Sequence, residues 1–187
     1  MTGRIIVLVT NKFENMQFER IETDRLKGER ICNEHWKLLL EMTSNLEVMA
    51  TLGGTLSKEK VKAKMKYNCE QWENYGHGQW IFCDKETEVF VGRGGIRRVV
   101  VNNRKEVELG YALMPEFWGK GLAVEIGEKA LSIAFDEFFY PSVVAYTLVT
   151  NKKSERVMQK IGFVFEKNIM HADIPHILYR YQNPNFS

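Results

Sequence analysis

The stretch from Glu108 to Glu125 reads ELGYALMPEFWGKGLAVE, and it decides the fold. It places a strand, a loop with two glycines and the start of a helix in immediate succession. Backbone N–H groups in the first turn of a helix have no intrahelical acceptor, and the helix dipole there favours negative charge. Gly119 and Gly121 let the backbone come close to a ligand, and Lys120 adds a positive charge beside them. The stretch therefore predicts an anion site, with a diphosphate as the expected ligand.

The sequence fits two other phosphate-binding loops, the dinucleotide-binding fingerprint and the P-loop, less well. The third glycine of a dinucleotide fingerprint would fall at position 124, which is Val124, and no alternating βαβ pattern follows. A P-loop is disfavoured because no Gly-Lys-Ser/Thr closes the motif. Two glycines alone also fit an ordinary strand-to-helix turn, so the loop by itself leaves both interpretations open.

A second informative stretch, Asn151-Lys-Lys-Ser154, follows an expected strand over 142–149. We expect Asn151 or Ser154 to cap a helix that ends at Gly162. That structural interpretation accounts for the pattern. A functional interpretation adds that Asn151 can hydrogen-bond an extended ligand with amide groups, and that the Ser154 hydroxyl can reach a reacting sulfur.

Hydrophobic periodicity predicts an α+β chain with a mixed, mostly antiparallel central sheet flanked by helices. Expected helices cover 33–44, 57–74, 119–139 and 154–161, and expected strands cover 5–9, 18–22, 25–30, 79–83, 89–100, 106–114, 142–149, 163–168 and 177–181. Without repeats or a linker, residues 18–187 are expected to form a single domain, and residues 1–17 an extension of uncertain role.

Composition narrows the class of protein. The 187 residues carry a formal net charge of +2, which is not the basic excess of a nucleic-acid binder. The three cysteines show neither zinc-ligand spacing nor a disulfide framework, and no stretch approaches the length of a membrane span. We therefore expect a cytoplasmic protein without a metal site, a membrane segment or a nucleic-acid partner, as a monomer or homodimer.

Several landmarks together resemble the GNAT superfamily of N-acetyltransferases, within it the branch of ribosomal-protein N-terminal acetyltransferases. The resemblance runs from about residue 18 to residue 181. Its landmarks are Ile21–Leu26 (IETDRL), Trp80–Phe82, Val91–Gly92, Glu108–Tyr111, Trp118–Ala123, Ala134–Phe135, Asn151–Ser154 and Met158–Phe163. Trp118 replaces the Gln or Arg that usually begins the superfamily's phosphate motif, a departure that leaves a backbone cradle intact.

The resemblance implies that acetyl-CoA is the acyl donor and binds in a splay between two parallel strands, 107–114 and 142–149. Its diphosphate would rest on Trp118, Gly119, Lys120, Gly121, Leu122 and Ala123. Asn151 would anchor the pantetheine arm. Backbone amides near Leu113 and Met114 would pair with that arm and polarise the thioester carbonyl.

The chemistry that the resemblance implies needs a neutral amine, because an ammonium group has no lone pair. Glu108 is the candidate base, acting through water, and Glu106 on the same face is the reserve. The structural alternative for Glu108 is an ion pair with Arg97 or Arg98 on the neighbouring strand. Ser154 would donate a proton to the leaving thiolate, or would only cap its helix.

The implied acceptor is a primary amine, with a protein N-terminal amine preferred. A small-molecule amine is the main alternative, namely a polyamine, an aminoglycoside or an amino acid. A small polycation would need carboxylates in the site. A non-catalytic acyl-CoA sensor is the alternative from a different class of protein.

Overall fold

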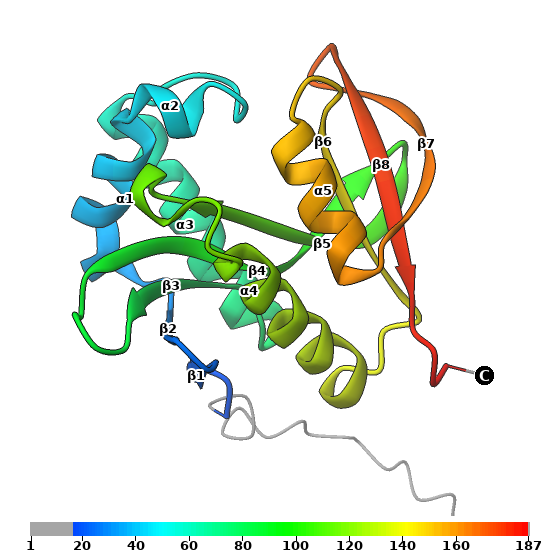
Figure 1. Cartoon of the computed structure of the whole chain (residues 1–187), viewed down its shortest axis with the longest axis horizontal. Coiled ribbons are helices and arrows are strands. Elements are labelled where there is room, and N and C mark those ends of the chain that lie inside the picture. Colours follow the sequence, from blue (N-terminus) through cyan, green and yellow to red (C-terminus); the bar gives the residue numbers. More distant parts are fainter. Residues whose placement is uncertain (1–16, 187) are drawn as a thin grey trace, which may run out of the picture.

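Eight strands form one sheet in the order β1-β2-β3-β4-β5-β6-β8-β7 (Figure 1). This computed structural model describes residues 17–186, so the strand expected over 5–9 lies outside the described residues. The strands are β1 (Arg20–Glu22), β2 (Leu26–Arg30), β3 (Gln79–Asp84), β4 (Phe90–Val101), β5 (Arg104–Leu113), β6 (Ser142–Leu148), β7 (Val164–His171) and β8 (Ile174–Gln182). The α+β fold with one parallel pair is confirmed.

Helices cover both faces of the sheet. They are α1 (Trp36–Ser44), α2 (Leu46–Met49), α3 (Lys58–Tyr75), α4 (Leu122–Ser132) and α5 (Lys152–Ile161). The main core lies between the sheet and α4, where Ile126 and Ala130 are fully buried, and a second core lies under α1 and α3. Within the described part of the chain, no helix is long and apolar enough to cross a membrane.

The parallel pair is open for most of its length. β5 and β6 register at a single pair, Glu108 with Val144. The Met114 N–H donates to the Val91 carbonyl of β4 at 2.9 Å. Since successive N–H groups of a strand point to opposite edges, those of Leu113 and Tyr111 point toward the opening. The splay implied by the resemblance is therefore present.

The structure corrects the expected bounds where the backbone has special conformations. The helix expected from 119 begins only at Leu122, because Gly119 and Gly121 have φ of +74° and +81°. The helix expected from 33 begins only at Trp36, after a short turn over Asn33–His35, and the short helix α2 was not predicted. Residues 168–177 form a β-hairpin that turns at Ala172 and Asp173, where a loop was expected.

His77 is fully buried between α3 and β3, although a solvent-exposed loop histidine would be the usual expectation. Its Nε2 lies 2.7 Å from the Tyr140 hydroxyl, and its ring packs edge-on against Phe138. Burial lowers the pKa of His77 from 6.5 to about 4. The fold therefore favours the neutral imidazole.

This burial predicts acid sensitivity. As pH falls through 6.5, His77 is protonated in the unfolded chain but stays neutral in the folded protein down to about pH 4. The free energy of unfolding therefore decreases across that window, by an amount on the order of 3 kcal/mol from this group. His77→Gln, which can still bond Tyr140 but does not titrate, is expected to lose less stability between about pH 7 and about pH 4.5 in urea unfolding. Equal losses in the two proteins would contradict this assignment.

Candidate active site

A cleft of about 860 Å³ lies where β5 and β6 diverge. Its volume is within the range of small-molecule and cofactor sites. Its walls come from α2, β4, β5, the segment 117–124, β6 and α5. The glycine loop and the Asn151 stretch, 30 residues apart in sequence, therefore border one cleft.

The glycine loop presents free backbone donors to this cleft. Among the described residues, no acceptor bonds the N–H groups of 119–123. A side chain at Gly119 would have no atom within 4 Å, so space lies open above the loop. Free N–H groups, a helix N-terminus and open space together suit a phosphate group.

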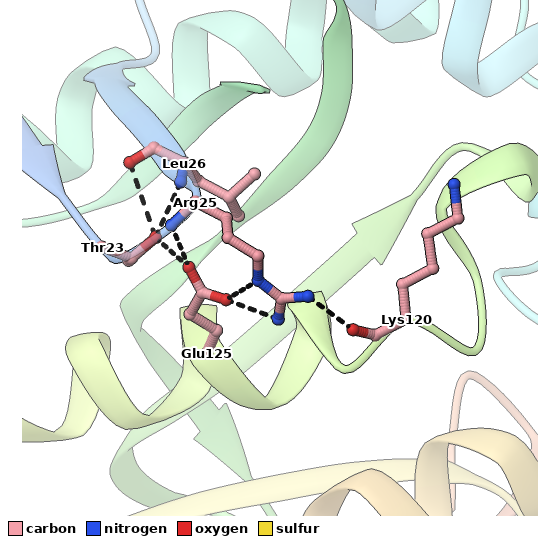
Figure 2. Close-up of polar contacts among 5 residues, drawn as sticks. All are labelled: Thr23, Arg25, Leu26, Lys120 and Glu125. Atoms are coloured by element: carbon pink, nitrogen blue, oxygen red, sulfur yellow. Dashed lines mark hydrogen bonds and ion pairs between the residues drawn. The ribbon is translucent and has the colours of Figure 1, made fainter. Parts of the chain in front are cut away.

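The turn between β1 and β2 is hydrogen-bonded to the glycine loop and to the first turn of α4 (Figure 2). The Arg25 guanidinium donates to the Lys120 carbonyl at 2.9 Å, and its Nε donates to Glu125 Oε2 at 2.7 Å. Glu125, in the first turn of α4, also accepts from the Thr23 hydroxyl and from the Arg25 N–H. The Lys120 carbonyl therefore faces Arg25, and a carboxylate fixes where α4 begins.

Across the cleft, α5 begins at an asparagine cap. Asn151 Oδ1 accepts from the Ser154 N–H at 3.1 Å, so Asn151 is the N-cap and Ser154 is not. The Ser154 hydroxyl lies 3.1 Å from the Tyr111 hydroxyl of β5. Burial raises the pKa of Tyr111 to about 12, so this phenol keeps its proton at neutral pH. The pair forms a short chain of hydroxyl groups at the cleft wall.

The wall of the cleft that α5 forms is rich in lysine and arginine. The α5 residues Lys152, Lys153, Arg156 and Lys160 all line it. Lys153 Nζ lies 4.5 Å from the centre of a Trp118 ring, a cation–π contact that bridges α5 and the glycine loop. This wall is therefore suited to an anionic ligand.

The opposite face of β5 carries an acidic and basic pair. Glu108, whose side chain is 6% exposed, accepts from Arg97 Nε at 2.7 Å and from a second guanidinium nitrogen at 3.2 Å. The alternative of an ion pair with Arg97 is therefore present, and both residues also line the cleft. The reserve candidate Glu106 instead pairs with Arg180 at 2.8 Å and does not line the cleft.

Most of the residues expected to bind the donor or to act on it come together here. Those that line the cleft are Glu108, Leu113, Trp118, Gly119, Gly121, Leu122, Ala123, Asn151 and Ser154. Met114 and Lys120 do not line it. The Met114 N–H is already bonded to β4, and the Lys120 ammonium lies 5.3 Å from the centre of the Phe117 ring.

Sequence reasoning missed several residues that form the site. Arg25 and Glu125 were not assigned roles, although Arg25 lies within the landmark IETDRL. Tyr111 entered only as part of the landmark Glu108–Tyr111, and Arg93 carried no signal because an arginine on a strand is commonly solvated. Within residues 17–186, no group of three or more His, Cys, Asp or Glu residues is arranged to hold a metal ion.

Comparison with known proteins agrees with this geometry. A family model described as "Acetyltransferase (GNAT) domain" matches residues 25–164. The chain belongs to the GNAT acetyltransferase family. The uncharacterized protein YkkB of Bacillus subtilis is 30% identical over 167 residues, which cover 89% of this chain and 97% of that protein. The resemblance expected from the sequence is confirmed, and as a GNAT protein the chain is an acyltransferase.

Solved structures of GNAT enzymes share the fold. A ribosomal-protein-S5-alanine acetyltransferase from Vibrio fischeri has a TM-score of 0.73 at 19% identity, covering 90% of this chain and 98% of that one. A spermidine N-acetyltransferase from Vibrio cholerae, in complex with CoA and spermine, has a TM-score of 0.67 at 15% identity, covering 86% and 97%. At such low identities the likeness shows the fold.

A glycine substitution tests whether the loop is a phosphate cradle. Gly119→Ala places a methyl group in the open space above the loop and strains a positive φ, so we expect weaker acetyl-CoA binding in calorimetry. Gly54→Ala is the matched control, because Gly54 also has a positive φ, open surroundings and no part in the cleft. Both variants should lose about 1–2 kcal/mol of stability. Equal affinity of the two variants would argue against the cradle.

Removing the support behind the loop is expected to weaken the same affinity. Arg25→Leu deletes the bonds to Glu125 and Lys120, and should raise the acetyl-CoA dissociation constant about 5- to 30-fold. Lys27→Leu removes only an exposed ion pair with Glu88 and serves as the control. If both variants bind as the unmodified protein does, Arg25 does not support the cradle.

Proposed function

We propose that this GNAT protein transfers an acetyl group from acetyl-CoA to a primary amine, and that the donor lies in the cleft between β5 and β6. The observation that carries the proposal is the opened parallel pair beside a glycine loop with free N–H groups. The diphosphate would rest on Trp118, Gly119, Lys120, Gly121, Leu122 and Ala123. Among these, Lys120 would contribute through its backbone and not through its ammonium, which lies against Phe117.

The pantetheine arm would continue along the free edge of β5. Leu113 and Tyr111 direct their N–H groups toward the opening, and an extended ligand with amide groups can pair with such an edge. The Met114 N–H is committed to β4, so we assign this role to Leu113 rather than to Met114. On the opposite wall, Asn151 would fix the start of α5 beside the pantetheine arm, since its Oδ1 already accepts the Ser154 N–H as the helix cap.

During transfer a C–N bond forms, the C–S bond breaks, the amine loses a proton and the thiolate gains one. Glu108 would take the proton of the amine through water, from within its pair with Arg97. Ser154, beside the Tyr111 hydroxyl, would supply a proton to the leaving sulfur. The two groups lie on opposite faces of β5, which separates proton removal from proton delivery.

For the acceptor, we propose a protein N-terminal amine ahead of a small polyamine. Glu47 and Glu108 are the carboxylates among the described residues that line the cleft, and Glu108 is already neutralised by Arg97. A polycation would find little opposite charge in such a site. The fold alone supports either acceptor, because ribosomal-protein and spermidine acetyltransferases share it.

Replacement of Glu108 tests its role as base. Glu108→Gln is expected to lower acceptor-dependent thiol release about 100-fold or more without changing acetyl-CoA affinity. Its residual rate should rise about tenfold per pH unit while the acceptor amine titrates, since the solution then removes the proton. Glu106→Gln, on the same strand but paired with Arg180 outside the cleft, is the matched control.

The same assay separates the alternatives. If Glu108→Gln releases thiol as fast as the unmodified protein and with the same pH dependence, Glu108 is not the base and only forms the ion pair with Arg97. Tight acetyl-CoA binding without release on any N-terminal peptide, amino acid, aminoglycoside or polyamine would favour an acyl-CoA sensor.

A further inference from the structure

The acceptor side of the cleft contains an arginine, Arg93, that forms no ion pair with any described carboxylate. Arg93 and Arg97 both line the cleft from β4. Arg97 lies opposite Glu108, and Arg93 lies opposite Ala112. Because residues opposite one another in a sheet share a face, both arginines lie on the face opposite to Tyr111 and Leu113. This face is separate from the hydroxyl pair that borders the expected thiol.

The two arginines differ in their partners. Glu108 accepts two hydrogen bonds from Arg97, which neutralises that guanidinium. Arg93 donates to Gln79 Oε1 at 2.7 Å, and an amide oxygen brings no charge. Among the described residues, no carboxylate lies within ion-pair distance of Arg93. A partly buried guanidinium without a counter-ion is uncommon in folded proteins.

The surroundings hold Arg93 in place and leave room beside it. Gln79 is 1% exposed, and its Nε2 bonds the Gly110 carbonyl at 3.4 Å, which aims its oxygen at Arg93. A side-chain carbon at Gly110 would lie 3.1 Å from that nitrogen and 3.7 Å from Glu108 Oε1. The glycine therefore keeps space open between Glu108 and Gln79. We call Arg93, Gln79 and Gly110 the Arg93 subsite.

Nearby charge strengthens the positive potential of this subsite. Lys64, on α3, has its pKa lowered to about 8 by burial and by the charges of Arg93 and Arg97. Burial and the charge of Arg97 likewise lower the pKa of Arg93 to about 10, with Glu108 acting in the opposite direction, and Arg93 stays charged at neutral pH. Such a field attracts anions and disfavours the protonated form of any amine beside it.

We propose that the acceptor is a primary amine that carries a carboxylate or phosphate group a few bonds away, and that Arg93 binds this anionic group. This inference rests on the proposed function and adds the class of acceptor. The amine would lie near Glu108 while the anion lies on the Arg93 guanidinium, whose remaining N–H groups can hold two oxygens at once. An anion there would supply the missing counter-charge and fix the orientation of the amine.

The test compares acceptors that differ only in this charge. Thiol release is measured for alanine and alaninamide, for phosphoethanolamine and ethanolamine, and for C-terminally amidated Ala-Glu-Ala and Ala-Gln-Ala. The first two pairs represent small molecules and the third represents a protein N-terminus, so the source of the anion is distinguished. We expect the anionic member of at least one pair to have the higher kcat/KM, by about tenfold or more. The neutral members have the less basic amines, so differences in protonation work against this result.

Variants tie the preference to Arg93. Arg93→Gln is expected to bring the anionic-to-neutral ratio close to one, with acetyl-CoA affinity unchanged, and Arg93→Lys is expected to keep part of the ratio. Arg98→Gln is the matched control, because Arg98 is the exposed neighbour of Arg97 and does not line the cleft. If Arg93→Gln does not fold, Arg93→Lys and the acceptor pairs decide the question.

Two failures can be told apart. If neutral members react as well as anionic ones, or if Arg93→Gln folds and leaves a high ratio unchanged, this inference is wrong while the acetyltransferase proposal stands. If acetyl-CoA does not bind, or if no amine is acetylated, the proposed function itself fails.

Discussion

The cleft depends on the interruption of a single β-ladder. β5 and β6 register only at Glu108 and Val144, and beyond that pair the two strands separate. A sheet edge left unpaired in the interior costs free energy unless other groups satisfy its donors and acceptors. One part of the edge is satisfied by Trp118, whose indole N–H donates to the Leu113 carbonyl at 2.8 Å. The N–H groups of Tyr111 and Leu113 remain directed at the opening, which makes the gap polar and suited to a ligand with amide groups.

The cleft has different chemistry on the two faces of β5, because successive side chains of a strand point to opposite faces. On the side of Tyr111, the cleft has the glycine loop, the basic residues of α5 and the hydroxyl pair with Ser154. On the side of Glu108, it has the guanidinium groups of Arg93 and Arg97. A donor and an acceptor can therefore approach one thioester from opposite faces of β5. On the donor side, Arg25 and Glu125 hold the glycine loop in place, because their hydrogen bonds fix where α4 begins.

Local patterns made much of this predictable. The glycine loop, a helix cap at Asn151 or Ser154 and the helix that follows depend on residues close in sequence, so sequence alone predicted them, and the structure places the cap at Asn151. The contacts that complete the site join distant residues: Arg25 and Glu125 are 100 positions apart, and Tyr111 and Ser154 are 43 apart. No local pattern encodes such pairs. The role expected for the Met114 N–H could not be assigned from sequence. The edge to which a strand N–H points depends on the strand register, which sequence does not determine to one residue.

A crystal structure of the protein with coenzyme A tests the central claim most directly. We expect the diphosphate on the N–H groups of 119–123 and the pantetheine amides paired with the open edge of β5, with the thiol of coenzyme A between Ser154 and Glu108. Coenzyme A bound elsewhere, or a ladder between β5 and β6 that closes over the gap, would contradict it.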